Sequence, residues 1–95
     1  MNRELEKFIK VYLDLEQAYD TSGYLRPTLF AFKGEYVNAV KQGLDELLRT
    51  RELSVLDYER LTNVEFDDED SLYEYLKGVY HYLFEGRETQ PTPPE

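Results

Sequence analysis

The segment from Asp68 to Glu85 most constrains the fold, because its apolar residues recur with the period of an α-helix. Apolar residues form the centre of one stripe and aromatic residues flank it on both sides: Leu72, Leu76, Val79, Leu83, Tyr73, Tyr75, Tyr80, Tyr82 and Phe84. This arc spans roughly 200°, about twice the width that a surface helix needs. The segment therefore predicts a helix that is central in a bundle, or one whose tyrosine flank meets another molecule.

The same period recurs in two other long segments and one short one. Apolar residues share one face over residues 3–19 and again over residues 35–49. A shorter helix is indicated after Ser54, a favoured N-cap residue, with Asp57 placed three residues later to reach back to the Ser54 amide. We expect this short helix to end by Thr62.

Residues 24–34 are ambiguous. Pro27 disfavours the helical conformation at the residue before it, so any helix here is expected to begin after Pro27. A short helix and an extended arm closed by Gly34 are equally compatible with the pattern, and a β-hairpin is the least favoured alternative.

The fold class that follows is all-α. We expect a compact bundle of three to five helices, one of them short, forming a single domain over residues 1–86. Residues 87–95 contain three prolines and no large apolar side chain. Such a segment buries too little surface to offset its ordering entropy, which predicts a disordered C-terminal tail.

Charge and composition together disfavour several function classes. Twenty acidic residues against eleven basic ones give a net charge of −9, which disfavours direct binding of nucleic acid. The chain has no cysteine, so it has neither disulfides nor thiolate chemistry. No segment resembles a signal peptide or a membrane span, and we expect a cytoplasmic protein without membrane contact.

Few residues suggest catalysis or metal binding. His81, the only histidine, falls opposite the leucine stripe, where a solvated side chain is expected. A calcium-binding loop starting at Asp68 fails, because Tyr73 stands where glycine is required and Val79 where glutamate is required. The glycines are scattered singly and form no phosphate-binding loop. We therefore predict no catalytic, metal-binding or cofactor-binding residue, and a protein that is not an enzyme.

The charge is unevenly distributed along the chain. Residues 1–51 carry eight acids and eight bases, whereas residues 52–95 carry twelve acids and three bases. The densest acidic stretch is residues 65–70. Acids at the start of a helix stabilise its dipole, so capping and solubility explain part of this run. The alternative is a docking site for a partner with a basic surface.

Tyrosine is common where one side of a residue is apolar and the other is wet, as at interfaces. The leading hypothesis is therefore a non-catalytic protein-binding module, such as an inhibitor, an immunity-type protein or an adaptor. Its expected contact residues are Glu65, Asp67, Asp68, Glu69, Asp70, Tyr73 and Tyr80. One alternative is a subunit that self-associates into a homo-oligomer. Another is a small ligand-binding or enzymatic domain with a cavity lined by Tyr36, Tyr58 or Tyr12.

Overall fold

Five helices joined by short loops account for most of the chain in this computed structural model, which describes residues 1–94. They are α1 (Arg3–Tyr12), α2 (Leu25–Phe30), α3 (Gly34–Thr50), α4 (Val55–Thr62) and α5 (Glu69–Phe84). No strand occurs among the described residues, so the expected all-α class is confirmed. None of the helices in this part of the chain combines the length and apolarity needed to cross a membrane.

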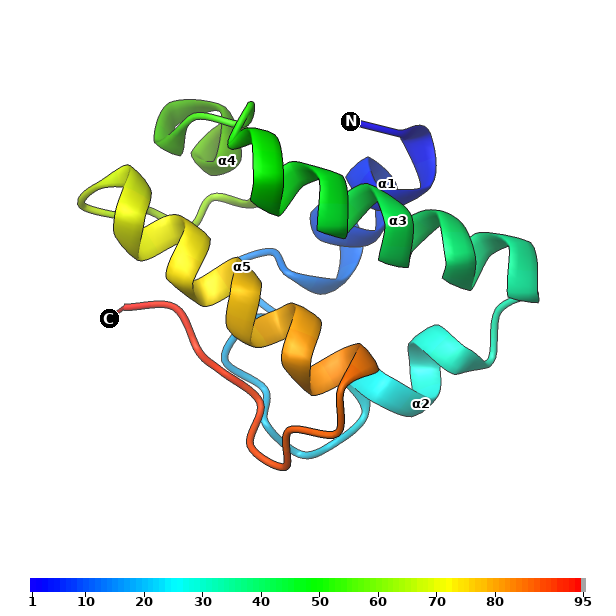
Figure 1. The fold of residues 1–95 in the computed structure, drawn as a ribbon. Helices are drawn as coiled ribbons and strands as arrows, with labels where there is room; N and C mark the ends of the chain where they lie inside the picture. Colours follow the sequence, from blue (N-terminus) through cyan, green and yellow to red (C-terminus); the bar gives the residue numbers. More distant parts are fainter. Residues whose placement is uncertain (95) are drawn as a thin grey trace.

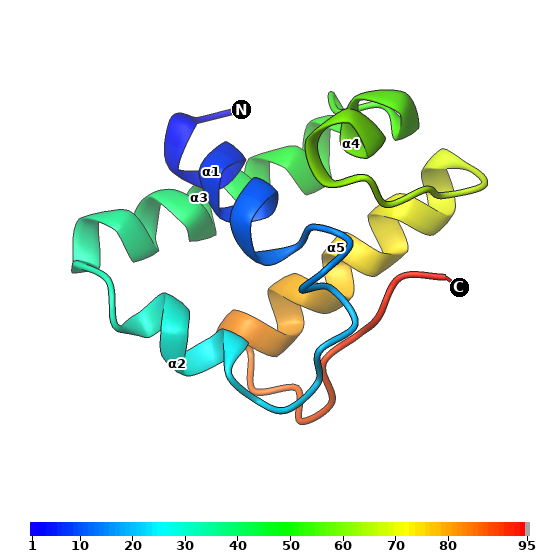
Figure 2. The ribbon, with the colours of Figure 1, turned by 180° about the vertical axis from the view of Figure 1, so that it is seen from behind.

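Helix α5 is the most deeply buried of the described helices, although α3 packs against more of its neighbours. It packs against α3 along one side and against α2 near its C-terminal end, while α1 contacts α3 and α4 (Figures 1 and 2). Half of its residues are buried: Leu72, Tyr73, Tyr75, Leu76, Gly78, Val79, Tyr82 and Leu83. The wide apolar arc read from the sequence is therefore mostly covered within the molecule itself.

The first helix is shorter than the sequence predicts. The expected helix over residues 3–19 ends at Tyr12, with Leu13 as its C-cap. Two hydrogen bonds turn the chain away from the helix axis. The Gln17 amide donates to the Asp14 carboxylate (3.0 Å), and the Leu15 amide donates to the carbonyl of Thr62, the last residue of α4 (2.8 Å). Local side-chain bonding by Asp14 thus competes with the helix that the apolar spacing favours.

The expectation that any helix in residues 24–34 begins after Pro27 is also wrong. Helix α2 starts at Leu25, so Pro27 lies in its first turn. The missing amide hydrogen of proline costs nothing there, because the first amides of a helix have no partner within it. The Thr28 amide donates to the Tyr24 carbonyl (3.0 Å) and closes this turn around the proline.

The remaining helix boundaries agree with the sequence pattern. Ser54 caps α4 by accepting a hydrogen bond from the Asp57 amide (3.0 Å), as predicted. The side chain of Asp57 pairs with Arg60 (2.9 Å) instead of returning to the Ser54 amide. Asp68 caps α5, and Gly86 follows the end of that helix with a φ of 78°, a conformation that favours glycine.

The chain after α5 follows a defined path, which differs from the disordered tail expected for residues 87–95. It turns back at Gly86 and runs alongside α5 toward that helix's N-terminal end (Figures 1 and 2). Residue 95 lies outside the described part. Hydrogen bonds join residues 87–94 to α2 and to the loop before it. The Arg26 side chain donates to the Arg87 carbonyl, the Tyr19 hydroxyl donates to the Pro94 carbonyl, and the Gln90 side chain donates to the Asp20 carbonyl.

Glycine in α5 is what admits this segment. A Cβ atom on Gly78 would lie 3.1 Å from Cγ of Pro91, so the proline ring fills the space that a side chain would occupy. Packing of proline rings against a helix needs no large apolar side chain. The composition of residues 87–95 does not reveal this packing against α5.

Candidate functional site

The acidic run at the start of α5 is partly structural. The carboxylate of Asp68 accepts a hydrogen bond from the Ser71 amide at 2.7 Å. This bond to the backbone, together with the Ser71 hydroxyl, lowers the pKa of Asp68 from its ordinary value of 3.8. Asp68 is therefore the N-cap of α5, and helix capping explains this part of the acidic run.

Two more of the predicted contact residues are paired within the molecule. Arg51 lies 2.8 Å from the Asp70 carboxylate and 3.6 Å from the Glu69 carboxylate. The hydrogen bond to Asp70 raises the pKa of the Arg51 guanidinium above its ordinary value. These pairs are exposed, so each contributes little stability.

The prediction that Tyr73 and Tyr80 contact the same partner as the acids needs correction. Tyr73 is 3% exposed and its hydroxyl is bonded to the backbone of Leu53, so it has no surface to offer. Tyr80 is half-buried beside Phe84, with ring centroids 5.3 Å apart. It borders a groove between α3 and α5 that is separate from the acidic run.

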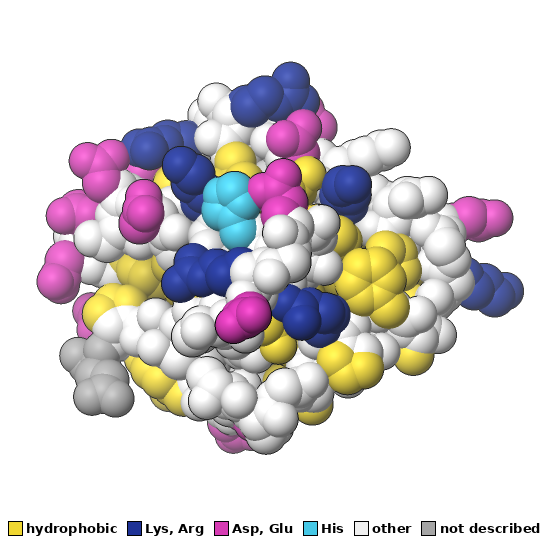
Figure 3. Space-filling view, turned by 60° about the horizontal axis from the view of Figure 1, so that its bottom comes forward, with side chains coloured by type: hydrophobic (Ala, Val, Ile, Leu, Met, Phe, Trp, Pro, Cys, Tyr) yellow, Lys and Arg dark blue, Asp and Glu magenta, His cyan; other side chains and the backbone are white. Residues whose placement is uncertain are grey.

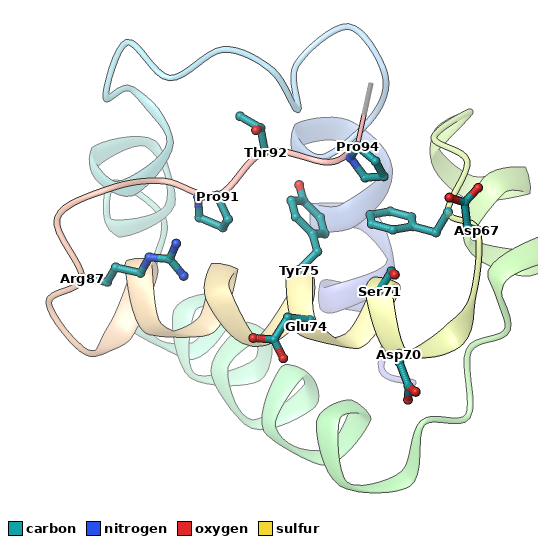
Figure 4. A pocket seen from close by; sticks show the side chains of 10 residues that line it. Asp67, Asp70, Ser71, Glu74, Tyr75, Arg87, Pro91, Thr92 and Pro94 are labelled. Carbon is teal, nitrogen blue, oxygen red and sulfur yellow. The ribbon is translucent and has the colours of Figure 1, made fainter.

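A cleft lies between the N-terminal half of α5 and the returning chain, with a volume of about 680 Å³ (Figure 4). We call it the acid-rimmed cleft. Its lining comes from the acidic run, from α5 and from the segment after α5: Phe66, Asp67, Asp70, Ser71, Glu74, Tyr75, Arg87, Pro91, Thr92 and Pro94. It thus combines three carboxylates, two aromatic rings and three residues of an extended wall.

The acids and the aromatic rings occupy different parts of this cleft. Figure 4 shows the Tyr75 ring rising from α5 toward the returning chain, between Pro91 and Pro94, whereas the Asp70 and Glu74 side chains point away from that chain. The Phe66 and Tyr75 rings are neighbours, with centroids 5.4 Å apart. Both residues are at most 6% exposed. The cleft therefore has a charged rim around an apolar floor.

The structure divides the predicted contact residues among several places. Asp67 and Asp70 reach the acid-rimmed cleft, whereas Glu65 lies at a smaller hollow beside Leu15 and Tyr19. Asp68 caps α5 and Glu69 pairs with Arg51. Only part of the acidic run therefore belongs to one site.

Eight of the ten cleft residues were not anticipated from the sequence, among them Phe66, Glu74 and Tyr75. A signal for Glu74 exists, because it lies four residues after Asp70 and therefore on the same face of the helix. Phe66 sits inside the acidic run, where its apolar side chain predicts a buried contact. Tyr75 belonged to the aromatic flank of the leucine stripe, and nothing in the sequence shows that it borders a cleft.

The groove between α3 and α5 has mixed charge. Its volume is about 430 Å³, and its lining includes Arg49, Lys77 and His81 as well as Asp45, Glu74 and Glu85. His81 is half-exposed and contacts Glu85 one turn later on α5. Figure 3 shows this histidine with both acidic and basic side chains around it. Acids and bases balance each other there, so the groove has no clear preference for an anion or a cation.

Aromatic side chains are exposed near α2. Phe30 and Phe32 are 51% and 39% exposed. Phe32 stacks on Tyr36 with ring centroids 4.4 Å apart, and Phe30 meets Phe84 edge-on at 6.1 Å. We call these four residues the aromatic patch.

The alternative of a cavity lined by Tyr36, Tyr58 or Tyr12 has a counterpart at Tyr36. Tyr58 is fully buried, with its ring against Phe66. Tyr36 borders a shallow hollow with Glu4 and Lys33.

Among residues 1–94, no group of three or more histidine, aspartate or glutamate side chains is arranged to hold a metal ion. Comparisons with protein-family models, with curated proteins and with solved structures found no match to this chain. The acid-rimmed cleft must therefore be interpreted from its own chemistry.

Proposed function

We propose that the chain is a non-catalytic protein-binding module that docks a basic segment of a partner protein, as an inhibitor, an immunity-type protein or an adaptor does. The observation that carries this proposal is the acid-rimmed cleft, in which Asp67, Asp70 and Glu74 line the same hollow as two aromatic rings. A carboxylate rim beside an apolar floor matches the two parts of a lysine or arginine side chain.

The apolar floor supports the choice of a basic side chain over a free cation. The stems of lysine and arginine pack on apolar surface while their charged ends stay near water or carboxylates. A guanidinium over an aromatic face gains further attraction. Within this molecule, the Arg26 guanidinium lies 4.1 Å from the centroid of the Tyr82 ring, which is the same kind of contact.

The distribution of charge supports a protein partner that approaches this end of the molecule. All of the −9 net charge comes from residues 52–95, where twelve acids face three bases. The electric field of these charges accelerates the encounter with a basic surface, and it becomes weaker as the salt concentration rises. The volume of about 680 Å³ lies within the range of pockets that bury small groups, so it suits one or two side chains.

Titration calorimetry with a tetra-arginine peptide at low and moderate salt tests the proposal. The matched pair of variants is Asp67→Lys/Glu74→Lys in the cleft and Glu6→Lys/Glu46→Lys on the exposed faces of α1 and α3. Each pair adds four charges and moves the net charge from −9 to −5. We leave Asp68 and Asp70 unchanged, because reversing them also removes a helix cap and an ion pair.

We expect the wild type and the α1/α3 variant to bind the peptide with similar affinity. The cleft variant is expected to lose about tenfold or more, because it loses the rim carboxylates and not only net charge. Equal losses in both variants would mean that the peptide responds to net charge alone, and the cleft would then not be its site.

The aromatic patch favours a second candidate function, self-association into a homo-oligomer. Large exposed aromatic side chains gathered in one place mark interaction sites more often than scattered ones do. Light scattering at several concentrations tests it with the variant Phe30→Ser/Phe32→Ser. A concentration-dependent mass in the wild type that falls to the monomer value in the variant supports an oligomer formed through this patch. A monomer at all concentrations contradicts it.

A further inference from the structure

The segment after α5 forms one wall of the acid-rimmed cleft. Pro91, Thr92 and Pro94 line the cleft opposite α5, and Arg87 lies at its other end (Figure 4). We infer that residues 87–94 are a strap that occupies the binding surface of α5 and that a basic partner segment displaces. This inference rests on the proposed function, because it concerns access to the same cleft.

The strap carries its own basic group into the acidic site. Arg87 is the one basic residue that lines the cleft, together with Asp67, Asp70 and Glu74. Its guanidinium lies over Gly78, at 2.7 Å from the position of a Cβ atom on that glycine. An arginine or lysine of a partner that approaches these carboxylates also meets the positive charge of Arg87, and like charges repel, so the docked strap disfavours its binding.

The attachment of the strap is incomplete. Gln90 is 8% exposed and donates a hydrogen bond to the Asp20 carbonyl at 3.2 Å. Its other amide atom, Oε1, is buried without a hydrogen-bond partner. A buried acceptor without a donor opposes burial, so docking of the strap carries a penalty that its release removes.

The remaining side-chain hydrogen bonds of the strap lie at its two ends, and between them Pro91 packs over Gly78 and Pro93 is buried. The Arg87 carbonyl accepts a hydrogen bond from Arg26 at 2.7 Å, and the Pro94 carbonyl accepts one from Tyr19. Between them, Glu88 and Thr89 are exposed. Most residues of the strap are exposed and few hydrogen bonds hold it, which is typical of a segment that opens locally without unfolding the rest.

Gly78 provides a way to release the strap in the full-length chain. The three atoms closest to a Cβ on Gly78 all belong to the strap: one of Arg87 and two of Pro91, at 2.7 to 3.3 Å. Gly78→Val therefore pushes on the strap first. The matched control is Gly34→Val, because a Cβ on Gly34 meets nothing within 4 Å. A second releasing variant, Pro91→Gly/Pro93→Gly, loosens the strap from its own side and leaves α5 unchanged.

The experiment measures two quantities for each variant. Amide hydrogen exchange of residues 87–94 without any ligand reports whether the strap is docked. Calorimetric titration with the tetra-arginine peptide reports the affinity of the cleft. A strap that occupies the binding surface of α5 in nine molecules of ten lowers the apparent affinity about tenfold.

We expect faster exchange in both releasing variants, with about tenfold tighter peptide binding than in the wild type or in Gly34→Val. Peptide binding to the wild type should also speed exchange of the strap. If the releasing variants exchange faster but bind no more tightly, the strap does not compete and the inference is wrong, while the proposed function stands. If neither the wild type nor a released variant binds the peptide, the proposed function fails and the inference fails with it.

Discussion

The hydroxyl group of Tyr73 makes two hydrogen bonds to the backbone of one residue, Leu53. It accepts from the Leu53 amide at 3.0 Å and donates to the Leu53 carbonyl at 2.8 Å. Leu53 lies just before α4, so this buried pair joins the start of α4 to the first turns of α5. The connection fixes the direction in which the acidic run enters α5.

Replacing Tyr73 with phenylalanine should therefore destabilise the fold. Tyr73→Phe leaves a buried amide and a buried carbonyl of Leu53 without partners, and such unpaired groups cost about 1–3 kcal/mol. Denaturant unfolding measures the loss. The control is Tyr80→Phe on the half-buried flank of α5, where we expect a change within about 0.5 kcal/mol. A Tyr73→Phe variant as stable as the control would show that water can replace these bonds.

Gly43 in α3 should not tolerate alanine, although alanine is the better helix former. A Cβ on Gly43 would lie 2.5 Å from Nδ2 of Asn2, which donates to the Ala39 carbonyl at 2.8 Å. The gain in helix propensity, about 1 kcal/mol, is smaller than the cost of overpacking, about 1–3 kcal/mol. We expect a net loss of up to about 2 kcal/mol in thermal or denaturant unfolding. Gly34→Ala, placed in open space, should show no loss.

The cap at Asp68 should make stability depend on pH in the acidic range. The folded state lowers the pKa of Asp68 from 3.8, so the unfolded state takes up the proton first as pH falls. The contribution of this carboxylate is thus complete above about pH 5 and is lost as pH falls below about 4. Asp68→Asn keeps a capping side chain that does not titrate.

The difference in unfolding free energy between wild type and Asp68→Asn should accordingly shrink as the solution is acidified. Glu46→Gln is the control, because it removes one exposed carboxylate that caps no helix. A difference that stays constant with pH would show that the Asp68 charge has no role in the cap.

The sequence predicts the helices well where period and cap agree. Ser54 and Asp68 each combine a capping side chain with an apolar period that follows, and both cap the helices expected of them. Prediction fails where a local hydrogen bond competes with the period, as at Asp14, and where proline falls in a first turn, as at Pro27. Both outcomes depend on interactions that spacing alone does not contain.

The candidate site is harder to predict, because it depends on how the chain returns after α5. The acidic run identifies Asp67 and Asp70 as candidates. The floor and the wall of the cleft come from uncharged residues outside that run, such as Tyr75 and Pro91, which share no sequence pattern with it. Burial of Tyr73 follows from its contact with Leu53, twenty residues earlier. Helical spacing places Tyr73 and Tyr80 on the same flank and does not show which of them is covered.

Tyr58 should respond to loss of its hydroxyl in the opposite way to Tyr73. Its side chain is fully buried, and its hydroxyl lies near that of Tyr75 without a hydrogen bond of good geometry. Removing an unpaired buried hydroxyl relieves a desolvation penalty, so Tyr58→Phe should be neutral or stabilising. Denaturant unfolding beside Tyr73→Phe provides the comparison. A loss above about 1 kcal/mol would reveal a bond between the two hydroxyls.

The same pair of tyrosines should make the fold sensitive to alkali. Burial raises the pKa of both Tyr58 and Tyr75 above the ordinary value of 10. Above about pH 10 the unfolded chain loses these protons while the folded chain keeps them, so stability falls as pH rises, by up to about 1.4 kcal/mol per pH unit for each tyrosine. Unfolding measured between roughly pH 9 and 11 should show a steeper decline in the wild type than in Tyr58→Phe/Tyr75→Phe. Equal slopes would mean that other groups control the alkaline limit.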